Sequence, residues 1–230
     1  MPVPRGIFVV VATMRSYATA REKIRDSLLA AGWPLTQVIW VYGKEPNAQE
    51  GVNWDPRGGY SVSVQENLYE MNAFLGAADW SDTLRLPAAS TVQFVLLHDT
   101  SWVGPRFATA VERLCTGPQH TDIIWLSANG QCNICIFNVA AARASRKFWA
   151  GTRVISKQRA IAWEWNTDPA SPKRLPVRHA FTTKPAAHIS RGRPAFSGSS
   201  NQRVVIYFEA IDLYKAYVHV DQNHQHPEAP

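Results

Sequence analysis

The sequence predicts an α/β protein with a mixed, mostly parallel sheet flanked by helices, and three observations carry this prediction. Apolar runs of strand length occur at Ile7 to Ala12, Val38 to Tyr42 and Val92 to Leu97. Between the first two, residues 18 to 31 place Ile24, Leu28 and Leu29 on one helical face. A strand, a helix and a strand at this spacing form a βαβ unit, which requires parallel strands and a right-handed crossover.

The loop after the first predicted strand argues against two common phosphate-binding motifs. Thr13-Met14-Arg15-Ser16-Tyr17 lacks the glycines of a dinucleotide fingerprint and the Gly-Lys-Ser/Thr of a P-loop. It supplies a hydroxyl, a cation and a ring instead, at Thr13, Arg15 and Tyr17.

His98-Asp99-Thr100 follows the third apolar run directly, which makes Asp99 the first candidate for chemistry. A buried strand that ends at a carboxylate presents it at the carboxyl edge of the sheet, where open α/β sheets bind their ligands. Gly104-Pro105 follows shortly after, and Asp in such a context is also ordinary turn chemistry. Both interpretations of Asp99, as a ligand-binding residue and as a turn residue, stay open at this point.

The order of these segments resembles the glycosyltransferases of the GT-A fold, which use nucleotide-sugar donors. The resemblance covers about residues 6 to 166. Its further parts are Gly58-Gly59-Tyr60 leading into a predicted helix over residues 64 to 74, and a strand over 134 to 137 followed by a helix from Val139. The resemblance implies a Rossmann-like GT-A fold of the small, single-domain type, a type that includes viral or phage enzymes that modify DNA.

The resemblance also implies a metal site. In that family an Asp-x-Asp motif at the position of His98-Asp99-Thr100 holds a divalent cation, Mn²⁺ or Mg²⁺, against the donor diphosphate. This chain has only Asp99 there, and a hard cation can take its other oxygen ligands from diphosphate and water. Many members bring a histidine from near the C-terminus to the metal, which here would be His219. The expected donor-binding residues are Thr13, Arg15, Tyr17, Asn67 and Asp99.

Glu164 is the expected general base. It lies between Trp163 and Trp165, and a carboxyl group beside indole rings has a raised pKa, which makes it a better base near neutral pH. In the resembled family the base commonly comes from the helix after the strand that corresponds to residues 134 to 137, with Asp168 as the reserve here. A surface glutamate between two packed tryptophans would show the same pattern.

The net charge of +6 is concentrated in one segment. The net charge is −2 over residues 1–140, +11 over residues 141–203 and −3 over residues 204–230. Such a basic segment is the electrostatic footprint of a polyanionic partner, because cations that neutralise phosphates release counterions. We expect Lys173, Arg174 and Arg178 to contact that partner, and we expect it to be a DNA acceptor in a hydroxymethylated form. A solvated basic face would have the same composition.

The sequence therefore predicts an inverting, metal-assisted glycosyltransferase that moves a sugar from a nucleotide-diphosphate donor to an acceptor hydroxyl. One alternative keeps the enzyme but gives it a glycan or protein acceptor. The other is a nucleic-acid-binding module without catalysis. A sugar nucleotidylyltransferase would ordinarily show a Gly-rich loop after the first strand, which this chain lacks.

Length and composition agree with one enzyme domain. At 230 residues and 46% hydrophobic content, the chain can bury a sizeable core. We expect a single domain over residues 1–220 and a disordered tail over residues 221–230. No apolar run has the length of a membrane span and no signal segment is evident, so a cytoplasmic location is expected. The three cysteines suit a reducing compartment and are expected to be buried structural thiols.

Overall fold

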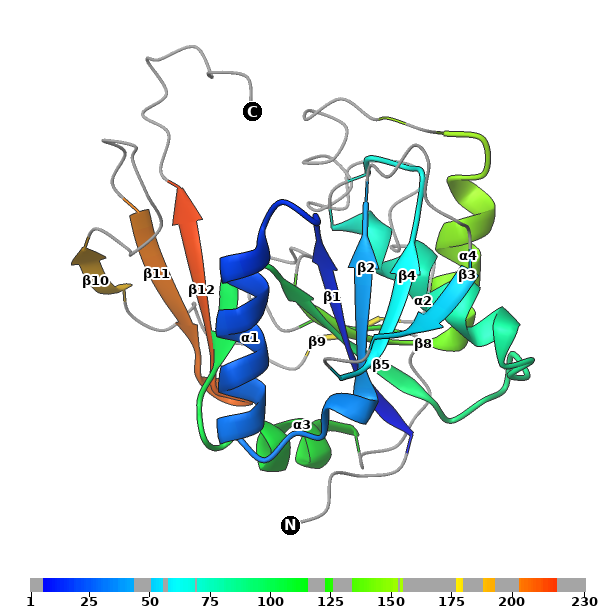
Figure 1. Cartoon of the computed structure of the whole chain (residues 1–230). Coiled ribbons are helices and arrows are strands. Elements are labelled where there is room, and N and C mark those ends of the chain that lie inside the picture. The colour runs from blue at the N-terminus through cyan, green and yellow to red at the C-terminus, as the bar shows by residue number, and fades with distance from the viewer. Residues whose placement is uncertain are drawn as a thin grey trace.

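The computed structural model of the chain describes two sheets and four α-helices (Figure 1). The described residues are 6–43, 51–55, 58–68, 70–115, 123–125, 134–152, 154, 177–179, 188–192 and 203–218. Within them, one sheet has eight strands in the order β3-β4-β2-β1-β5-β8-β7-β9, and the other has four in the order β10-β11-β12-β6.

The bounds of these elements are as follows. The larger sheet contains β1 (Ile7–Thr13), β2 (Val38–Tyr42), β3 (Gly51–Trp54), β4 (Tyr60–Ser63), β5 (Gln93–His98), β7 (Ile123–Trp125), β8 (Cys135–Asn138) and β9 (Val177–His179). The smaller sheet contains β6 (Ser101–Val103), β10 (His188–Gly192), β11 (Arg203–Phe208) and β12 (Leu213–Val218). The helices are α1 (Ala18–Ala30), α2 (Met71–Thr83), α3 (Phe107–Cys115) and α4 (Val139–Phe148), with short 3₁₀ turns η1 (Leu35–Gln37) and η3 (Glu209–Ile211).

The centre of the larger sheet is parallel. β4, β2, β1 and β5 pair in parallel, and β3, β8 and β7 add antiparallel pairings. Val9, Val10 and Val11 are fully buried because helices cover both faces of β1, which is why this strand appears in the sequence as a continuous apolar run. The predicted fold class, a mixed and mostly parallel α/β sheet flanked by helices, is confirmed.

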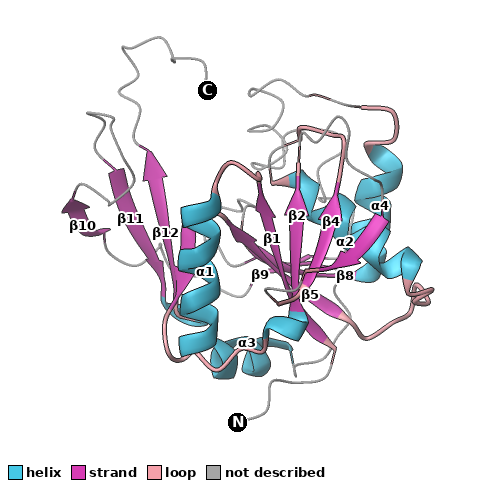
Figure 2. Ribbon diagram, in the orientation of Figure 1, coloured by secondary structure: helices cyan, strands magenta, loops and turns pink. Residues whose placement is uncertain are grey.

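The two central crossovers cover opposite faces of the sheet (Figure 2). On one face, Ile24 and Leu28 of α1 pack in one core cluster with Val9 and Val11 of β1. On the other face, Phe74 of α2 belongs to a second cluster. The chain passes from β1 through α1 to β2, and from β4 through α2 to β5 on the other side of β1. The strand order therefore reverses at β1 and β5, which creates a topological switch point at their carboxyl ends.

The smaller sheet lies on the α1 side and was not predicted. β5 continues through Asp99 and Thr100 into β6, which pairs with β12, and the Val103 N–H donates to Ser27 Oγ of α1 at 3.1 Å. Phe208 and Leu213 join the same core cluster as α1. In Figure 1, α1 accordingly lies between the two sheets.

The helix predicted over residues 64 to 74 is wrong at its start, because α2 begins only at Met71. Residues 60–63 form β4, and in Ser61-Val62-Ser63-Val64 the two valines are buried in the cluster under α2. This alternation is the period of a strand rather than of a helix. The helix predicted from Val139 is confirmed, and Asn138 Oδ1 caps it by accepting the Ala141 N–H at 2.9 Å.

None of the helices in the described residues is long and apolar enough to cross a bilayer. Cys115 and Cys135 are buried free thiols, and burial raises the pKa of the Cys135 thiol. For these two residues the predicted structural role is consistent with their burial, because a thiol buried in apolar surroundings is inert. Cys132 lies outside the described residues.

Gly76 lets α2 approach β2 closely. A Cβ at this position would lie 2.7 Å from Val41 Cγ1, which is closer than carbon atoms pack. We expect Gly76→Ala to lower the free energy of unfolding by about 1–3 kcal/mol in urea denaturation, the usual cost of overpacking. Because the clash is with one side chain, the penalty should shrink in a Val41→Ala background. Strictly additive effects of the two substitutions would contradict this contact.

Candidate functional site

The candidate site lies at the carboxyl ends of β1 and β5, where the switch point is. Ala12 and His98 are paired in register, so Thr13 and Asp99 follow at the same edge. Tyr42 ends the neighbouring strand β2 opposite Thr13, and the Gly43 N–H donates to the Thr13 carbonyl oxygen at 3.1 Å. This edge is where an open parallel sheet binds its ligands.

A partly buried charged network adjoins Asp99, with side-chain exposures of 24% for His98 and 12% for Glu70. His98 Nε2 lies 2.9 Å from Glu70 Oε1, and His98 Nδ1 lies 2.8 Å from Asp99 Oδ1. Burial by itself lowers the pKa of His98, but the carboxylates of Glu70 and Asp99 outweigh this effect and raise the pKa to about 9. For Glu70 the effects have the opposite sign. Burial by itself raises the pKa of Glu70, but the positive charges of His98 and Lys215 outweigh burial and hold that pKa far below its ordinary value. His98 is therefore an imidazolium at neutral pH, with both ring N–H groups facing carboxylates.

The sequence singled out Asp99 and missed Glu70. Glu70 directly precedes α2, on the crossover that covers the opposite face from α1. Its contact with His98 joins residues that are far apart in the chain, so no local motif predicts it. A histidine at the end of a buried strand was the available signal, because a buried imidazole needs hydrogen-bond partners.

The loop after β1 gathers positive charge over one ring. The guanidinium carbon of Arg15 lies 4.7 Å from the centroid of the Tyr42 ring, and that of Arg21 lies 5.3 Å from it. Arg21 Nη1 donates to the carbonyl oxygens of Met14 at 2.5 Å and Arg15 at 2.9 Å, which fixes the loop. Tyr17, 43% exposed, is the N-cap residue of α1 and makes no side-chain capping bond.

The start of α1 adds to this positive potential. Its first turn contains no acidic residue, so the partial positive charge of the helix N-terminus is not neutralised from within the helix. Backbone N–H groups at such a terminus favour anions, phosphates included. The carboxyl end of β1 therefore combines a hydroxyl, two guanidinium groups and a helix N-terminus.

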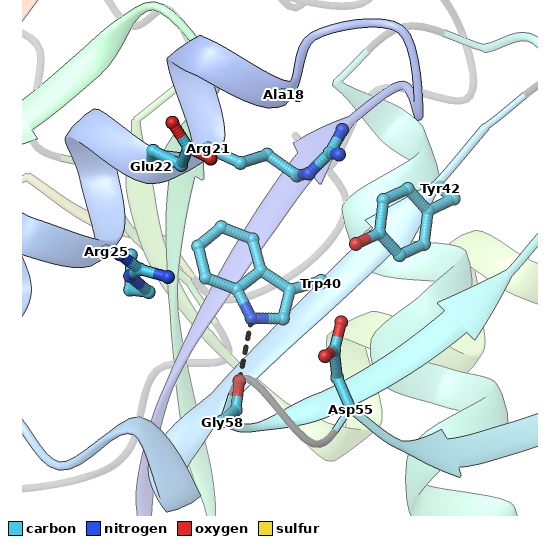
Figure 3. Close-up of a pocket in the computed structure, with 8 residues that line it drawn as sticks. All are labelled: Ala18, Arg21, Glu22, Arg25, Trp40, Tyr42, Asp55 and Gly58. Carbon is cyan, nitrogen blue, oxygen red and sulfur yellow. Dashed lines mark hydrogen bonds between the residues drawn. The ribbon is translucent and has the colours of Figure 1, made fainter.

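A pocket of about 50 Å³ adjoins this loop (Figure 3). In Figure 3, the Trp40 indole lies at its centre and the Arg21 side chain extends toward Tyr42. Trp40 Nε1 donates to the Gly58 carbonyl oxygen at 3.1 Å, which holds the ring in place. Arg25, Glu22 and Asp55 also line the pocket, so a planar polar group would find rings, two guanidinium groups and two carboxylates there.

Asn67 lies on the chain segment that follows β4 and links the site to the chain after α4. It forms an isolated parallel bridge with Val154. This bridge places residue 154, ten positions before Glu164, at the carboxyl edge of the sheet. Glu164 itself lies outside the described residues.

The structure thus brings several predicted site residues to one edge of the sheet. These residues are Thr13, Arg15, Tyr17, Asn67 and Asp99. The predicted residues outside the described part of the chain are Glu164, Asp168, Lys173, Arg174 and His219. Arg178 lies in β9 opposite Ile124, and the structure describes its backbone alone.

Two cations of the basic segment are engaged in helix packing. Arg143 Nε donates to Asp82 Oδ1 at 2.7 Å, and Arg146 Nη1 donates to Glu66 Oε1 at 2.6 Å. Arg146 Nε also pairs with Asp79 at 3.1 Å. These two arginines bind α4 to α2 and to the segment before α2. Their charges are paired with carboxylates, so they add little to the polyanion contact that was predicted for the basic segment.

The described donor atoms do not by themselves fit a divalent cation. Asp99 Oδ1 is shared with His98, and the Asp99 side chain is only 7% exposed. Among the described residues, no group of three or more His, Cys, Asp and Glu side chains is arranged to hold a metal ion. One buried carboxylate that faces an imidazole is a poor ligand for a hard cation, which needs several oxygen ligands.

No protein-family model matches the chain, and no curated protein sequence does either. Among solved structures, the chain is similar to "a glycosyltransferase involved in the glycosylation of the major capsid of PBCV-1". The TM-score is 0.41 at 9% identity, over 75% of this chain and 80% of that chain. A similarity at this level carries no argument about function, so the function must be argued from the site.

Proposed function

We propose that the chain is a glycosyltransferase with a nucleotide-diphosphate sugar as donor. The observation that carries this proposal is the gathering of Thr13, Arg15 and the His98-Asp99 turn at the switch point of a mostly parallel sheet. Open α/β sheets bind nucleotides at this place. The loop after β1 has none of the glycine patterns of dinucleotide or P-loop sites, so it favours another class of nucleotide ligand. The motif order shared with GT-A glycosyltransferases supports the nucleotide-sugar class.

In this proposal the donor lies along the loop that connects β1 to α1. The diphosphate faces Arg15 and the N-terminus of α1, where guanidinium and backbone N–H groups favour anions. The nucleoside lies beside Arg21, which covers the Tyr42 ring, and toward the pocket around Trp40. Thr13 and Tyr17 supply hydroxyl groups at the same edge.

The transfer itself needs a base on the acceptor side. The acceptor oxygen attacks the anomeric carbon, the bond from that carbon to the diphosphate oxygen breaks, and the base takes the acceptor proton. Glu164 is the proposed base and Asp168 its reserve. The bridge between Asn67 and Val154 supports this assignment, because it brings the chain that leads to both acids to the carboxyl edge.

The proposed acceptor is hydroxymethylated DNA, and the charge of residues 141–203 supports it. Since Arg143 and Arg146 are paired with acids, contacts to phosphates fall to other members of that segment, Lys173, Arg174 and Arg178 among them. A glycan or protein acceptor is the first alternative. A binding module without catalysis is the second, and the single carboxylate of the His98-Asp99-Thr100 segment favours it.

The deciding experiment is a donor screen that detects released nucleoside diphosphate. Each nucleotide sugar is tested with and without hydroxymethylated DNA, and with either Mn²⁺, Mg²⁺ or EDTA. We expect one donor to release its diphosphate, faster when the acceptor is present. Arg15→Gln and Glu164→Gln preparations are run in parallel, and both should lose the release. Release that is unchanged in both variants would contradict the proposed active site. A binding module would release no diphosphate from any donor.

DNA binding has its own test, the salt dependence of affinity. We expect affinity to fall steeply between about 50 and 200 mM salt, with a log-log slope near −0.9 for each phosphate neutralised. The triple charge reversal Lys173→Glu, Arg174→Glu and Arg178→Glu should flatten that slope. The matched control Lys23→Glu, Arg85→Glu and Arg113→Glu changes the net charge equally outside the segment and should keep it. Equal slopes in both triple variants would contradict a DNA contact by these residues.

A further inference from the structure

We propose that protein cations, rather than a divalent metal ion held by Asp99, neutralise the diphosphate of the donor. This inference rests on the proposed function and specifies how its donor site works. It follows from the disagreement between the metal site that the sequence resemblance implies and the contacts that the structure shows.

The first step concerns Asp99, whose carboxylate already has a partner. His98 Nδ1 is 2.8 Å from Asp99 Oδ1, and Glu70 holds the other ring nitrogen at 2.9 Å. The ring is thereby fixed between two carboxylates. A metal ion on Oδ1 would have to displace His98 from this position. Magnesium in particular keeps several waters in an octahedral shell, and a side chain that is 7% exposed leaves little room for one.

The second step concerns the number of ligands. Two carboxylates lie at the end of β5, Asp99 and Glu70, and each faces a ring nitrogen of His98. No group of three or more His, Cys, Asp and Glu side chains in the described residues is arranged to hold a metal ion. Diphosphate oxygens can complete the shell of a cation that the protein already holds. They still need one or two accessible carboxylates to anchor that cation, and Asp99, which is 7% exposed and faces His98, does not offer an accessible one.

The third step concerns the charge that is present instead. Arg15 and Arg21 both lie over the Tyr42 ring, with their guanidinium carbons 4.7 and 5.3 Å from its centroid. In the described residues, Arg21 bonds carbonyl oxygens and no carboxylate, so its charge is not cancelled by an ion pair there. Its bonds to Met14 and Arg15 fix the loop and hold the two guanidinium groups near each other.

The geometry suits a diphosphate. A guanidinium group forms bidentate hydrogen bonds with phosphate oxygens and keeps its charge at any physiological pH. The N-terminus of α1 begins three residues after Arg15 and brings unneutralised N–H groups to the same loop. Two guanidinium groups can balance the two charges of the bound donor's diphosphate, which is the task that a divalent cation performs elsewhere. The N–H groups of the α1 N-terminus favour the further negative charge that the diphosphate gains as it leaves.

The test is the binding of free nucleoside diphosphates, measured by titration calorimetry. The panel is ADP, CDP, GDP, UDP and dTDP, each in EDTA and in Mn²⁺. We expect the diphosphate that binds to do so in EDTA, with a dissociation constant within about threefold of that in Mn²⁺. In EDTA, Arg15→Gln and Arg21→Gln should each weaken binding about tenfold or more, as expected for loss of a charged hydrogen bond.

Two controls separate binding from folding. Arg113→Gln removes a guanidinium group from α3 and should leave affinity unchanged. Arg21→Lys keeps the charge but loses the planar fork, and should bind better than Arg21→Gln and worse than the native protein. Thermal unfolding of each variant identifies any loss that comes from destabilisation. If, across all four variants, the loss of affinity is proportional to the loss of melting temperature, destabilisation explains the weaker binding and the inference is overturned.

The outcomes distinguish the inference from the proposed function. Binding that requires Mn²⁺ and is lost in Asp99→Asn overturns the inference and leaves the glycosyltransferase in place. Binding in EDTA that neither arginine variant weakens overturns it as well. If no diphosphate binds under either condition, the inference and the proposed donor site both fail.

Discussion

Replacing His98 by leucine should lower the free energy of unfolding by about 3–5 kcal/mol near pH 7, the range for breaking a buried ion pair. The substitution removes the imidazole that lies 2.9 Å from Glu70 and 2.8 Å from Asp99, and leaves two carboxylates without it. Urea denaturation measures the loss. The control is Arg25→Leu, which breaks the more exposed pair of Arg25 with Asp26 and should cost less than about 1 kcal/mol.

The pH dependence of this loss has a definite sign. The pKa of His98 is raised from 6.5 to about 9, so its stabilising contribution is complete below pH 6.5 and disappears as the pH rises through 9. The pKa of Glu70 is lowered, so its contribution is present above pH 4.5 and is lost as the pH falls toward its folded pKa. The native protein and His98→Leu should therefore differ most between these limits, near pH 5.5, and least above pH 9. An equal difference at both pH values would show that the His98 ring is not charged.

Replacing Glu164 by glutamine should lower turnover about 10²-fold or more, the range for loss of a general base, while donor affinity stays unchanged. The amide keeps the shape of the side chain and cannot accept the proton of the acceptor hydroxyl. Steady-state release of nucleoside diphosphate gives kcat, and calorimetry gives donor affinity.

The matched control for this prediction is Asp168→Asn, which makes the same chemical change four residues away. Turnover should stay within a few-fold of native in this variant. If the two results are reversed, Asp168 is the base. If both variants keep native turnover, the base lies elsewhere in the chain.

The parallel core of the fold could be predicted because its signals are local. Residues 7 to 12 and 38 to 42 are continuous apolar runs, and Ile24 and Leu28 lie one helical turn apart. Each of these patterns reports the burial of a single element on its own. The predicted start of α2 was wrong because the resemblance suggested a helix from residue 64. The alternation of Ser61, Val62, Ser63 and Val64 indicates a strand instead. The sequence therefore contains the local signal of this strand, and the prediction followed the resemblance instead.

The pairing that attaches the smaller sheet had no such signal, although β11 itself is an apolar run of strand length. β6 is only three residues long, and it pairs with β12 across more than one hundred residues of chain. A strand of that length has no periodicity to detect, since its stability comes from its partner and from the packing of Phe208 and Leu213 on the α1 side. Antiparallel pairing between distant segments is a property of the folded chain.

The sequence by itself determined the order of strands and helices around β1, and it placed Thr13 and Asp99 at strand ends. Parallel strands bring such ends to one edge, so the prediction of a ligand site at this edge followed from pattern and handedness alone. Only the tertiary structure decided what Asp99 faces. Glu70 and His98 meet because the α2 crossover returns over the opposite face of the sheet, and the Coulomb interaction depends on that distance rather than on separation in the chain. The same packing placed Arg15 and Arg21 over Tyr42 at the end of β2, whereas Asp99 lies on the other side of β1 at the end of β5. Along this one edge of the sheet, the arginines therefore contact an aromatic ring and the carboxylate contacts His98.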